Sequence, residues 1–220
     1  MTTARGTLIV FEGLDRAGKS TQCELLAKHL RSNGRVVESM RFPDRATPIG
    51  QAINSYLAGE SQQEDHVMHL LFSANRWERA QAIKDHINGG KTVIIDRYYY
   101  SGCVYSAAKQ KPDLSLEWCR QPEVGLPRPD ICIFLDISAE AAAKRGGFGA
   151  ERYEKQEMQD RVRHLFTELR AHEDEAGDIV VIDAGRSVED VERSIQKAVG
   201  AACERASTHR SNLRFVAPWR

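Results

Sequence analysis

The residues with the clearest chemical potential lie near the start of the chain, in the segment G-L-D-R-A-G-K-S-T from Gly13 to Thr21. This segment fits the phosphate-loop pattern of two glycines four residues apart, followed by Lys and then Ser or Thr. In that pattern the glycines let backbone N–H groups point at a phosphate. Lys19 would reach the terminal phosphates, and the Ser20 hydroxyl can bind Mg²⁺. The segment therefore predicts a site for a nucleoside triphosphate with Mg²⁺.

A second group with chemical potential is the pair Asp96 and Arg97, which follows the apolar residues T-V-I-I. P-loop enzymes place at this position the carboxylate that holds Mg²⁺, often through water. An adjacent arginine could stabilise a phosphate that is being transferred or received. The alternative is an ion pair that only closes the strand. We favour the functional interpretation because the position matches the Mg²⁺ role.

Two further pairs could bind a second substrate. Arg45, in the segment R-F-P-D-R, would form with Arg97 a second anion site that faces the first. Phe72 and Arg76 lie four residues apart on one helix face. They offer an aromatic plane and a hydrogen-bond donor to a planar base. Spacing alone makes both pairs more typical of surface or structural residues.

A glycine-rich segment, residues 142–154, interrupts a helical pattern between Arg145 and Arg152. One interpretation is a hinged lid that closes over phosphates, excludes water and brings cations. The other is a mobile surface loop between two helices, and the segment alone does not separate the two.

Elements with the right order and length surround these residues. Residues 7–12 form an apolar, strand-like run before the phosphate loop, and a helical pattern follows it. The expected strands are 7–12, 36–40, 92–96, 131–136 and 179–183, and the expected helices are 19–32, 47–58, 64–88, 138–145, 154–175 and 187–206. This context disfavours a glycine-rich turn that merely links a strand to a helix. It adds the positive end of a helix dipole to the loop.

The alternation of strands and helices predicts an α/β fold with right-handed crossovers. We expect a single P-loop domain over residues 1–220, with three layers, α/β/α, around a five-stranded parallel sheet and with a glycine-rich lid. Ligands of such sheets bind at the carboxyl ends of the strands. The tail at about 207–220 is expected to be loosely held.

An apolar stripe marks one face of the expected helix 64–88. Its members are Val67, Leu70, Leu71, Ala74 and Trp77. Such a stripe is either core or a subunit contact, and spacing alone favours core.

Composition indicates a globular protein that handles a small ligand. Of the 220 residues, 41% are hydrophobic and 28% are charged, and 31 Lys and Arg balance 31 Asp and Glu. We therefore expect no nucleic acid and no membrane among its partners. A cytoplasmic location is expected in the absence of an apolar signal segment, with a nuclear or organellar pool left open. The five widely spaced cysteines predict neither a zinc site nor a disulfide framework.

Taken together, these segments resemble the thymidylate kinase family, within the nucleoside monophosphate kinases of the P-loop class. The resemblance covers about residues 6–183 and rests on F-E-G-L-D-R-A-G-K-S-T-Q, R-F-P-D-R, L-F-S-A-N-R-W-E, D-R-Y-Y-Y-S-G and R-G-G-F-G-x-E-R-Y-E. It implies a kinase that transfers the ATP γ-phosphoryl group to dTMP, giving dTDP and ADP in dTTP synthesis, with Mg²⁺. It also implies a homodimer, which makes the apolar stripe more typical of an interface. The chain resembles the eukaryotic-type members in having an arginine, Arg16, inside the phosphate loop.

The resemblance further implies site residues. The catalytic set is Asp15, Arg16, Lys19, Asp96 and Arg97, with the transition-state charge on Arg16. The ATP-binding set is Gly13, Arg16, Ala17, Gly18, Lys19, Ser20, Thr21 and Arg145, the last at the adenine. The dTMP-binding set is Asp15, Phe42, Arg45, Phe72, Arg76, Arg97, Ser101, Gly102, Tyr105, Tyr153 and Gln159. Ser20 and Asp96 are the implied Mg²⁺ ligands.

Within the dTMP set, the family implies individual roles. Arg45 and Arg97 would hold the acceptor phosphate, while Phe72 stacks on thymine and Arg76 donates to a base carbonyl. Phe42, Ser101 and Gly102 would wall the pocket, and Tyr105 would lie beneath the sugar. Asp15 would contact the sugar 3′-hydroxyl, and Tyr153 and Gln159 would close over the nucleoside.

Two other functions compete with this one. The first is a kinase for another monophosphate or for a deoxynucleoside. The second is a nucleotide-dependent switch or binding module with no acceptor. A switch would not need Arg45, Phe72 and Arg76 to meet at one pocket, so their placement separates these functions.

Overall fold

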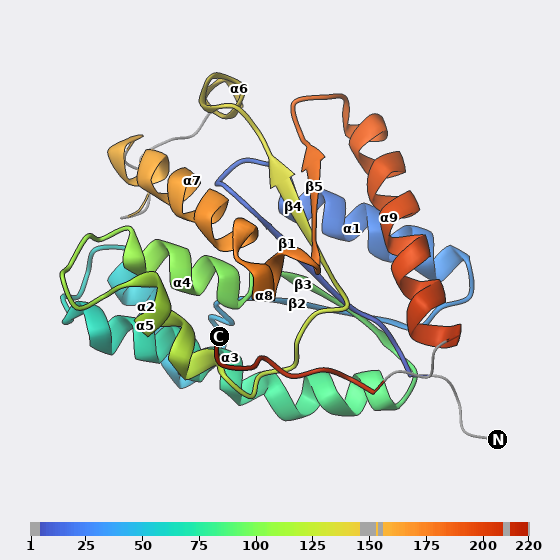
Figure 1. The fold of residues 1–220 in the computed structure, drawn as a ribbon, viewed down its shortest axis with the longest axis horizontal. Helices are drawn as coiled ribbons and strands as arrows, with labels where there is room; N and C mark the ends of the chain where they lie inside the picture. The colour runs from blue at the N-terminus through green and yellow to red at the C-terminus, as the bar shows by residue number, and fades with distance from the viewer. Residues whose placement is uncertain (1–4, 146–152, 154–155, 209–211, 220) are drawn as a thin grey trace.

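A computed structural model describes residues 5–145, 153, 156–208 and 212–219 (Figure 1). At its centre lies a parallel five-stranded sheet in the order β2-β3-β1-β4-β5. The strands are β1 (Leu8–Gly13), β2 (Val37–Arg41), β3 (Thr92–Asp96), β4 (Ile131–Asp136) and β5 (Ile179–Asp183). The predicted α/β class and the predicted parallel sheet are both confirmed.

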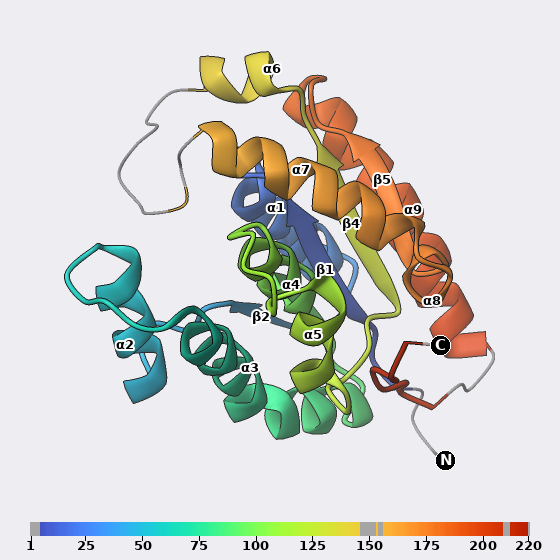
Figure 2. The same cartoon turned by 60° about the vertical axis from the view of Figure 1, so that its left-hand side comes forward.

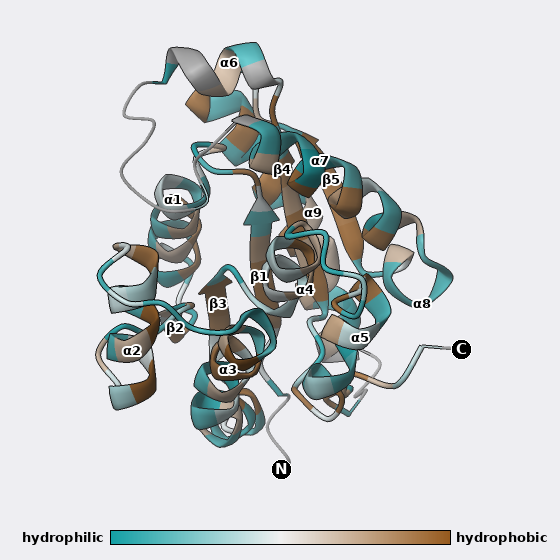
Figure 3. Cartoon of the chain, turned by 90° about the vertical axis from the view of Figure 1, so that its left-hand side faces the viewer, coloured by the Kyte–Doolittle hydropathy of each residue, from teal (hydrophilic) through white to brown (hydrophobic). Residues whose placement is uncertain are grey.

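Helices cover both faces of the sheet because side chains alternate along its strands. Leu8 and Val10 of β1 point into one core, and Ile9 and Phe11 point into the other. The first core is covered by α3 (Asp65–Asn88), α4 (Tyr99–Ala107) and α7 (Gln156–Ala171), and the second by α1 (Lys19–Ser32) and α9 (Val188–Thr208) (Figure 2). The smaller elements are α2 (Pro48–Leu57), α5 (Leu116–Arg120), the 3₁₀ turn η1 (Gln121–Glu123), α6 (Ala139–Lys144) and α8 (Glu173–Ala176). Hydrophobic colour concentrates along the strands of the sheet (Figure 3).

The strand register brings the chemically active ends of three strands together. Phe11 of β1 pairs with Asp96 of β3, and Arg41 of β2 pairs with the same residue. Because the strands are parallel, the loops that follow them leave from one edge of the sheet. This edge carries the phosphate loop, the segment after β2 and Arg97.

Helix α4 is missing from the expected elements, and its capping explains why. Tyr98 at its N-cap provides no side-chain hydrogen bond. The backbone N–H groups of Tyr98 and Ser101 instead donate to Glu12 of β1, at 2.8 and 3.0 Å. A cap that comes from a distant strand leaves no local start signal in the sequence. The expected helix 154–175 is also two helices, α7 and α8, and His172 caps the second.

The tail differs from the expectation over residues 212–219. The Val216 N–H donates to the Leu126 carbonyl at 2.9 Å, and the Gly125 N–H donates to the Val216 carbonyl at 2.8 Å. The Trp219 ring stacks on His172 with centroids 4.1 Å apart. These contacts hold the segment against the loop before β4 and against the N-cap of α8, so the expectation of a loosely held tail is wrong there.

Part of the apolar stripe on α3 lies at the surface and not in the core. Val67, Leu70 and Trp77 are 44%, 47% and 41% exposed. The opposite face of the helix is buried, and it includes Met68 and Ile83. The spacing argument for core was wrong for these three residues, whereas Leu71 packs against the core cluster that contains Met68. Periodicity shows that a face is apolar but not what covers it.

Most of the expected lid falls on residues 146–152 and 154, which lie outside the described residues. Its first residues end helix α6, and Tyr153 is defined. Among the helices that the structure describes, none combines the length and the apolar character needed to cross a membrane.

Candidate functional site

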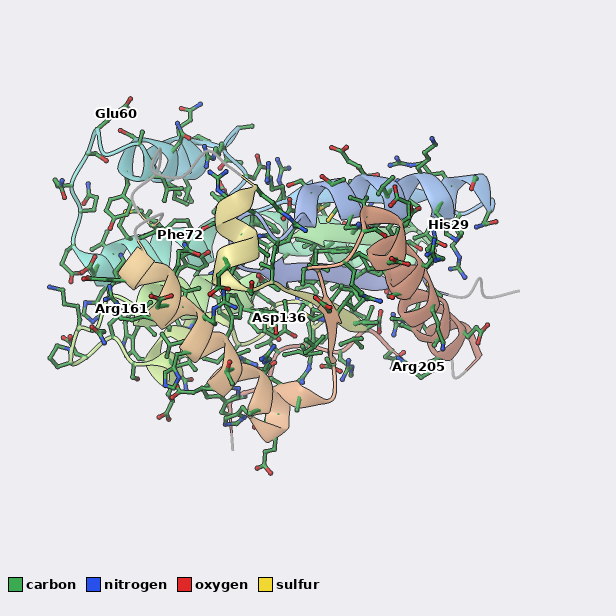
Figure 4. All side chains as sticks on the ribbon, turned by 90° about the horizontal axis from the view of Figure 1, so that it is seen from above. His29, Glu60, Phe72, Asp136, Arg161 and Arg205 are labelled. Carbon is green, nitrogen blue, oxygen red and sulfur yellow. The ribbon has the colours of Figure 1, made fainter. Side chains whose placement is uncertain are left out.

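A cavity of about 1100 Å³ lies over the carboxyl ends of β1, β2 and β3. From the phosphate loop its walls include Asp15, Arg16, Gly18, Lys19, Ser20 and Thr21. From elsewhere they include Phe42, Arg45, Phe72, Arg76, Arg97, Ser101, Gly102, Tyr105 and Tyr153. Figure 4 shows Phe72 at the end of the molecule away from His29 of α1 and Arg205 of α9. Residues from distant parts of the sequence thus share one cavity with the phosphate loop.

The phosphate loop leaves β1 in a conformation that requires glycine. Gly13 has a φ of 137°, and a Cβ built there would lie 2.5 Å from the Leu135 carbonyl oxygen of β4. The loop ends at Gly18, a left-handed residue at the N-cap of α1. The helix N-terminus therefore points its free N–H groups at the cavity.

Lys19 is folded back onto the loop that precedes it. Its Nζ donates to the carbonyls of Gly13 and Leu14, at 3.1 and 2.7 Å. Burial, helped by the positive charge of Arg97, lowers the pKa of Lys19 to about 8, although Asp15 and Asp96 act in the opposite direction. A phosphate in the cavity would favour the charged form of this lysine.

Ser20 and Asp96 meet at the end of β3. The Ser20 hydroxyl donates to Oδ2 of Asp96 at 2.7 Å. Oδ1 of Asp96 is buried without a hydrogen-bond partner among the described residues. Arg41, which the sequence analysis missed, donates to Ser20 Oγ at 2.8 Å and lies 3.3 Å from Oδ2 of Asp96. Mg²⁺ takes oxygen ligands, so a hydroxyl beside a carboxylate with an unused oxygen suits this ion. Arg41 shows that the same place also accommodates a positively charged side chain.

Glu12 is another buried carboxylate, and the sequence analysis missed it. Besides the two backbone N–H groups at the start of α4, it accepts a hydrogen bond from the Ser101 hydroxyl. Burial raises the pKa of Glu12, against the opposing charge of Arg97 and these hydrogen bonds. The available signal was an acidic residue at the end of an otherwise apolar strand run.

Arg97 and Asp15 form the centre of the cavity wall. Arg97 adopts a φ of 65°, its Nη1 donates to Ser101 Oγ at 3.0 Å, and its Nη2 pairs with Oδ1 of Asp15. The Tyr105 hydroxyl donates to Oδ2 of Asp15 at 2.9 Å. Although burial acts in the opposite direction, Arg97 and Lys19 hold the pKa of Asp15 below its usual value. Asp15 is therefore an ionised acceptor that faces the cavity.

Helix α7 reaches the same carboxylate. Nε2 of Gln159 donates to Oδ2 of Asp15 and to the Tyr153 carbonyl, both at 2.9 Å. The Tyr153 ring lies 5.8 Å from the Tyr105 ring, between centroids. Tyr153 is thus linked to the phosphate loop through Gln159 and Asp15.

Arg76 lies at the other end of the cavity, paired with Glu123, the second carboxylate that the sequence analysis missed. Its Nε and Nη2 donate to the two oxygens of Glu123, at 2.9 and 2.5 Å. A Cβ at Gly102 would lie 2.5 Å from Nη2, so the guanidinium lies directly against α4. Glu123 carried no local signal, because its partner is on another helix.

The remaining predicted residues occupy the edges. Arg45 is exposed, and its Nη1 donates to Asn54 Oδ1 at 2.8 Å. Ala17 is buried beneath the loop. Arg145 donates to the Arg16 carbonyl at 3.0 Å and to the Ala184 carbonyl at 2.6 Å. Arg145 therefore braces the phosphate loop from the β5 side, outside the described cavity wall.

Comparisons of this chain with known sequences and structures all match the same family. A sequence model described as thymidylate kinase matches residues 11–195. Thymidylate kinases from zebrafish (Danio rerio) and humans (Homo sapiens) are 48% and 46% identical to this chain, each over 89% of it and 91% of the relative. The one from Schizosaccharomyces pombe is 52% identical over 87% of this chain and 90% of its own. A solved thymidylate kinase structure from Candida albicans matches with a TM-score of 0.89 and 37% identity, over 98% of this chain and 100% of that one.

The lowered pKa of Lys19 predicts that binding of a nucleoside triphosphate takes up a proton near pH 8. Without ligand, about half of the lysine is deprotonated at pH 8. Anionic phosphates raise this pKa, so proton uptake is expected at about pH 8–9, and affinity should fall as the pH rises further. Isothermal titration calorimetry in buffers of different ionisation enthalpy measures the uptake.

Lys19→Arg is the matched control because a guanidinium stays charged over this range. This variant should bind the nucleotide without the proton uptake. Equal uptake by the variant and the wild type, or none by the wild type, would contradict the assignment to Lys19.

Proposed function

The chain belongs to the thymidylate kinase family, and we infer that it is a nucleoside monophosphate kinase that transfers the ATP γ-phosphoryl group to dTMP. The products are ADP and dTDP. The observation that carries this conclusion is a single cavity lined at one end by Lys19 and the phosphate loop, and at the other by Phe72 and Arg76. A donor and an acceptor that enter from opposite ends would meet near Arg97.

The proposed catalysis rests on position and charge. Phosphoryl transfer requires the donor and the acceptor in line, with the charge on the transferred group neutralised. We assign this neutralisation to Lys19, Arg16 and Arg97, with Arg16 stabilising the transition state. The acceptor phosphate is already anionic, so no side chain needs to act as a strong base.

For the metal, we propose Ser20 and Asp96 as ligands. The unpartnered Oδ1 of Asp96 supports this assignment. Mg²⁺ bound there would supply positive charge between the phosphates of the donor. The described residues contain no group of three or more His, Cys, Asp or Glu that could hold a metal. The metal would therefore depend on phosphate oxygens and water for its other ligands.

For the acceptor, we propose that Arg45 and Arg97 bind the phosphate and that Asp15 receives the sugar 3′-hydroxyl. Tyr105 and Gln159 support this role because both donate to Asp15. The base would lie against Phe72, and Arg76 would donate to one of its carbonyls. At the donor end, Arg145 would contact adenine from its position beside the phosphate loop.

An acceptor panel tests the function. ATP is supplied with dTMP, dUMP, UMP, AMP or thymidine, and product formation is measured for each. We expect the highest kcat/KM for dTMP. The thymidylate kinase from Candida albicans is described as having broad substrate specificity, so all five acceptors should be tested. Dominance of another acceptor would overturn the choice of substrate, and slow ATP hydrolysis without acceptor phosphorylation would indicate a switch.

Arg16→Ala tests the proposed transition-state role. Loss of a cation that acts mainly in the transition state should lower kcat by roughly 10³-fold, while the dissociation constant of ATP changes little. Stopped or coupled kinetics give kcat, and calorimetry gives affinity. Arg35→Ala, at an exposed arginine before β2, is the control and should leave both values unchanged. Near-normal turnover of Arg16→Ala would assign the charge to another group.

We also propose that two copies of the chain associate through the exposed stripe of α3. Val67, Leu70 and Trp77 form a set of exposed apolar side chains on a helix whose other face holds Arg76. Contiguous exposed apolar patches mark interaction sites, and a two-fold axis would pair this one with itself. A dimer would thus brace the helix that carries the base-binding residues.

Leu70→Glu tests this interface. A charge at the centre of the patch should shift the protein from dimer to monomer in sedimentation velocity at micromolar concentration. Val188→Glu is the matched control, since Val188 is 48% exposed at the start of α9. A wild-type monomer, or a dimer that survives Leu70→Glu, would rule out this surface.

A further inference from the structure

The pair formed by Arg76 and Glu123 is almost completely withdrawn from water. Its side chains are 3% and 0% exposed, yet Arg76 still forms part of the cavity wall. Two parallel N–H···O bonds join the guanidinium to the carboxylate, which is the geometry that fixes an arginine plane most firmly. Glu123 therefore holds the arginine from behind, on the side away from the cavity.

A second contact fixes the same group from another direction. A Cβ at Gly102 would lie 2.5 Å from Nη2 and 2.8 Å from Nη1 of Arg76. The guanidinium thus lies flat against α4, with no room for a side chain between them. Glu123 and Gly102 together leave Arg76 a single orientation.

This arrangement determines which ligand atoms can form a hydrogen bond with Arg76. Arginine offers only donors, and Glu123 takes the Nε–H and one N–H of Nη2, so a ligand can use only the N–H groups of Nη1 and the second N–H of Nη2. A ring carbonyl satisfies such a donor. An exocyclic amino group at the same place would set donor against donor, and that leaves buried polar groups unpaired.

We propose that Glu123 is a positioning residue that holds Arg76 for a base carbonyl, so that it sets both the affinity for thymine and the exclusion of cytosine. The proposal rests on the function inferred above, in which Arg76 faces the base. It goes beyond that function because Glu123 does not touch the substrate. Without the carboxylate, the guanidinium would lose its fixed direction and its counter-charge.

Glu123→Gln tests the proposal because it keeps the size of the side chain and removes its charge. The KM for dTMP should rise by about tenfold or more, with kcat changed by less than about threefold. The ratio of kcat/KM for dTMP to that for dCMP should fall by about tenfold. Calorimetric dissociation constants of dTMP and dCMP should shift in the same way.

Glu175→Gln is a matched control elsewhere in the fold. Glu175 is fully buried and accepts two bonds from Arg120, at 2.9 and 2.7 Å, and neither residue is part of the cavity wall. Its loss should lower the melting temperature much as Glu123→Gln does, because each variant leaves a buried arginine without its counter-charge. It should leave the KM for dTMP and the dTMP-to-dCMP ratio unchanged.

A double-mutant cycle separates positioning from general damage. If Glu123 acts through Arg76, then Glu123→Gln should add nothing to the KM of an Arg76→Met variant. Glu123→Asp keeps the charge and withdraws it by one methylene, so it should give a smaller shift in the same direction. It also serves as the test if Glu123→Gln does not fold at the assay temperature.

Three results would overturn the proposal. The first is a folded Glu123→Gln variant in which neither the KM for dTMP nor the dTMP-to-dCMP ratio of kcat/KM changes. The second is a Glu123→Asp variant in which neither quantity changes. The third is a double-mutant cycle in which the effects of Glu123→Gln and Arg76→Met on KM are additive. A wild-type protein that does not phosphorylate dTMP would instead remove the proposed function. The two failures are therefore distinguishable.

Discussion

A single carboxylate, that of Glu12, joins the sheet to helix α4, which contributes Ser101, Gly102 and Tyr105 to the cavity wall. It is the penultimate residue of β1 and is completely buried. It accepts hydrogen bonds from Tyr98 and Ser101 at the start of α4. Helix α4 has no side-chain cap of its own, so this carboxylate satisfies N–H groups that would otherwise be unpaired. Gly13 and the phosphate loop follow directly after it. The two ends of the cavity are thus built on one rigid junction, as an in-line reaction requires.

The same junction explains how cations can be concentrated in a small space. Lys19 and Arg97 lie among Glu12, Asp15 and Asp96, which offset their charges before any phosphate arrives. Such groups need little rearrangement when a ligand binds, and this is the main source of electrostatic catalysis. The lowered pKa of Lys19 follows mainly from its burial, to which the positive charge of Arg97 adds.

The sequence predicted what depends on neighbouring residues and missed what depends on distant ones. The phosphate loop is a contiguous pattern, and the strands are continuous apolar runs, so both could be predicted. Helix α4 could not, because its cap comes from β1. Glu12 and Glu123 escaped for a related reason, since each is explained only by a partner far along the chain. The tail was misjudged because it is mostly polar, although Val216 bonds to the loop before β4 and Trp219 stacks on His172.

That packing has a consequence for how the protein is made. Gly125 and Leu126, which lie two and three residues after Glu123, are held by backbone hydrogen bonds to Val216. A ribosome synthesises the turn long before the segment that secures it, and chains fold as they emerge. The turn next to Glu123 can therefore reach its final packing only after the sheet and the phosphate loop have been synthesised.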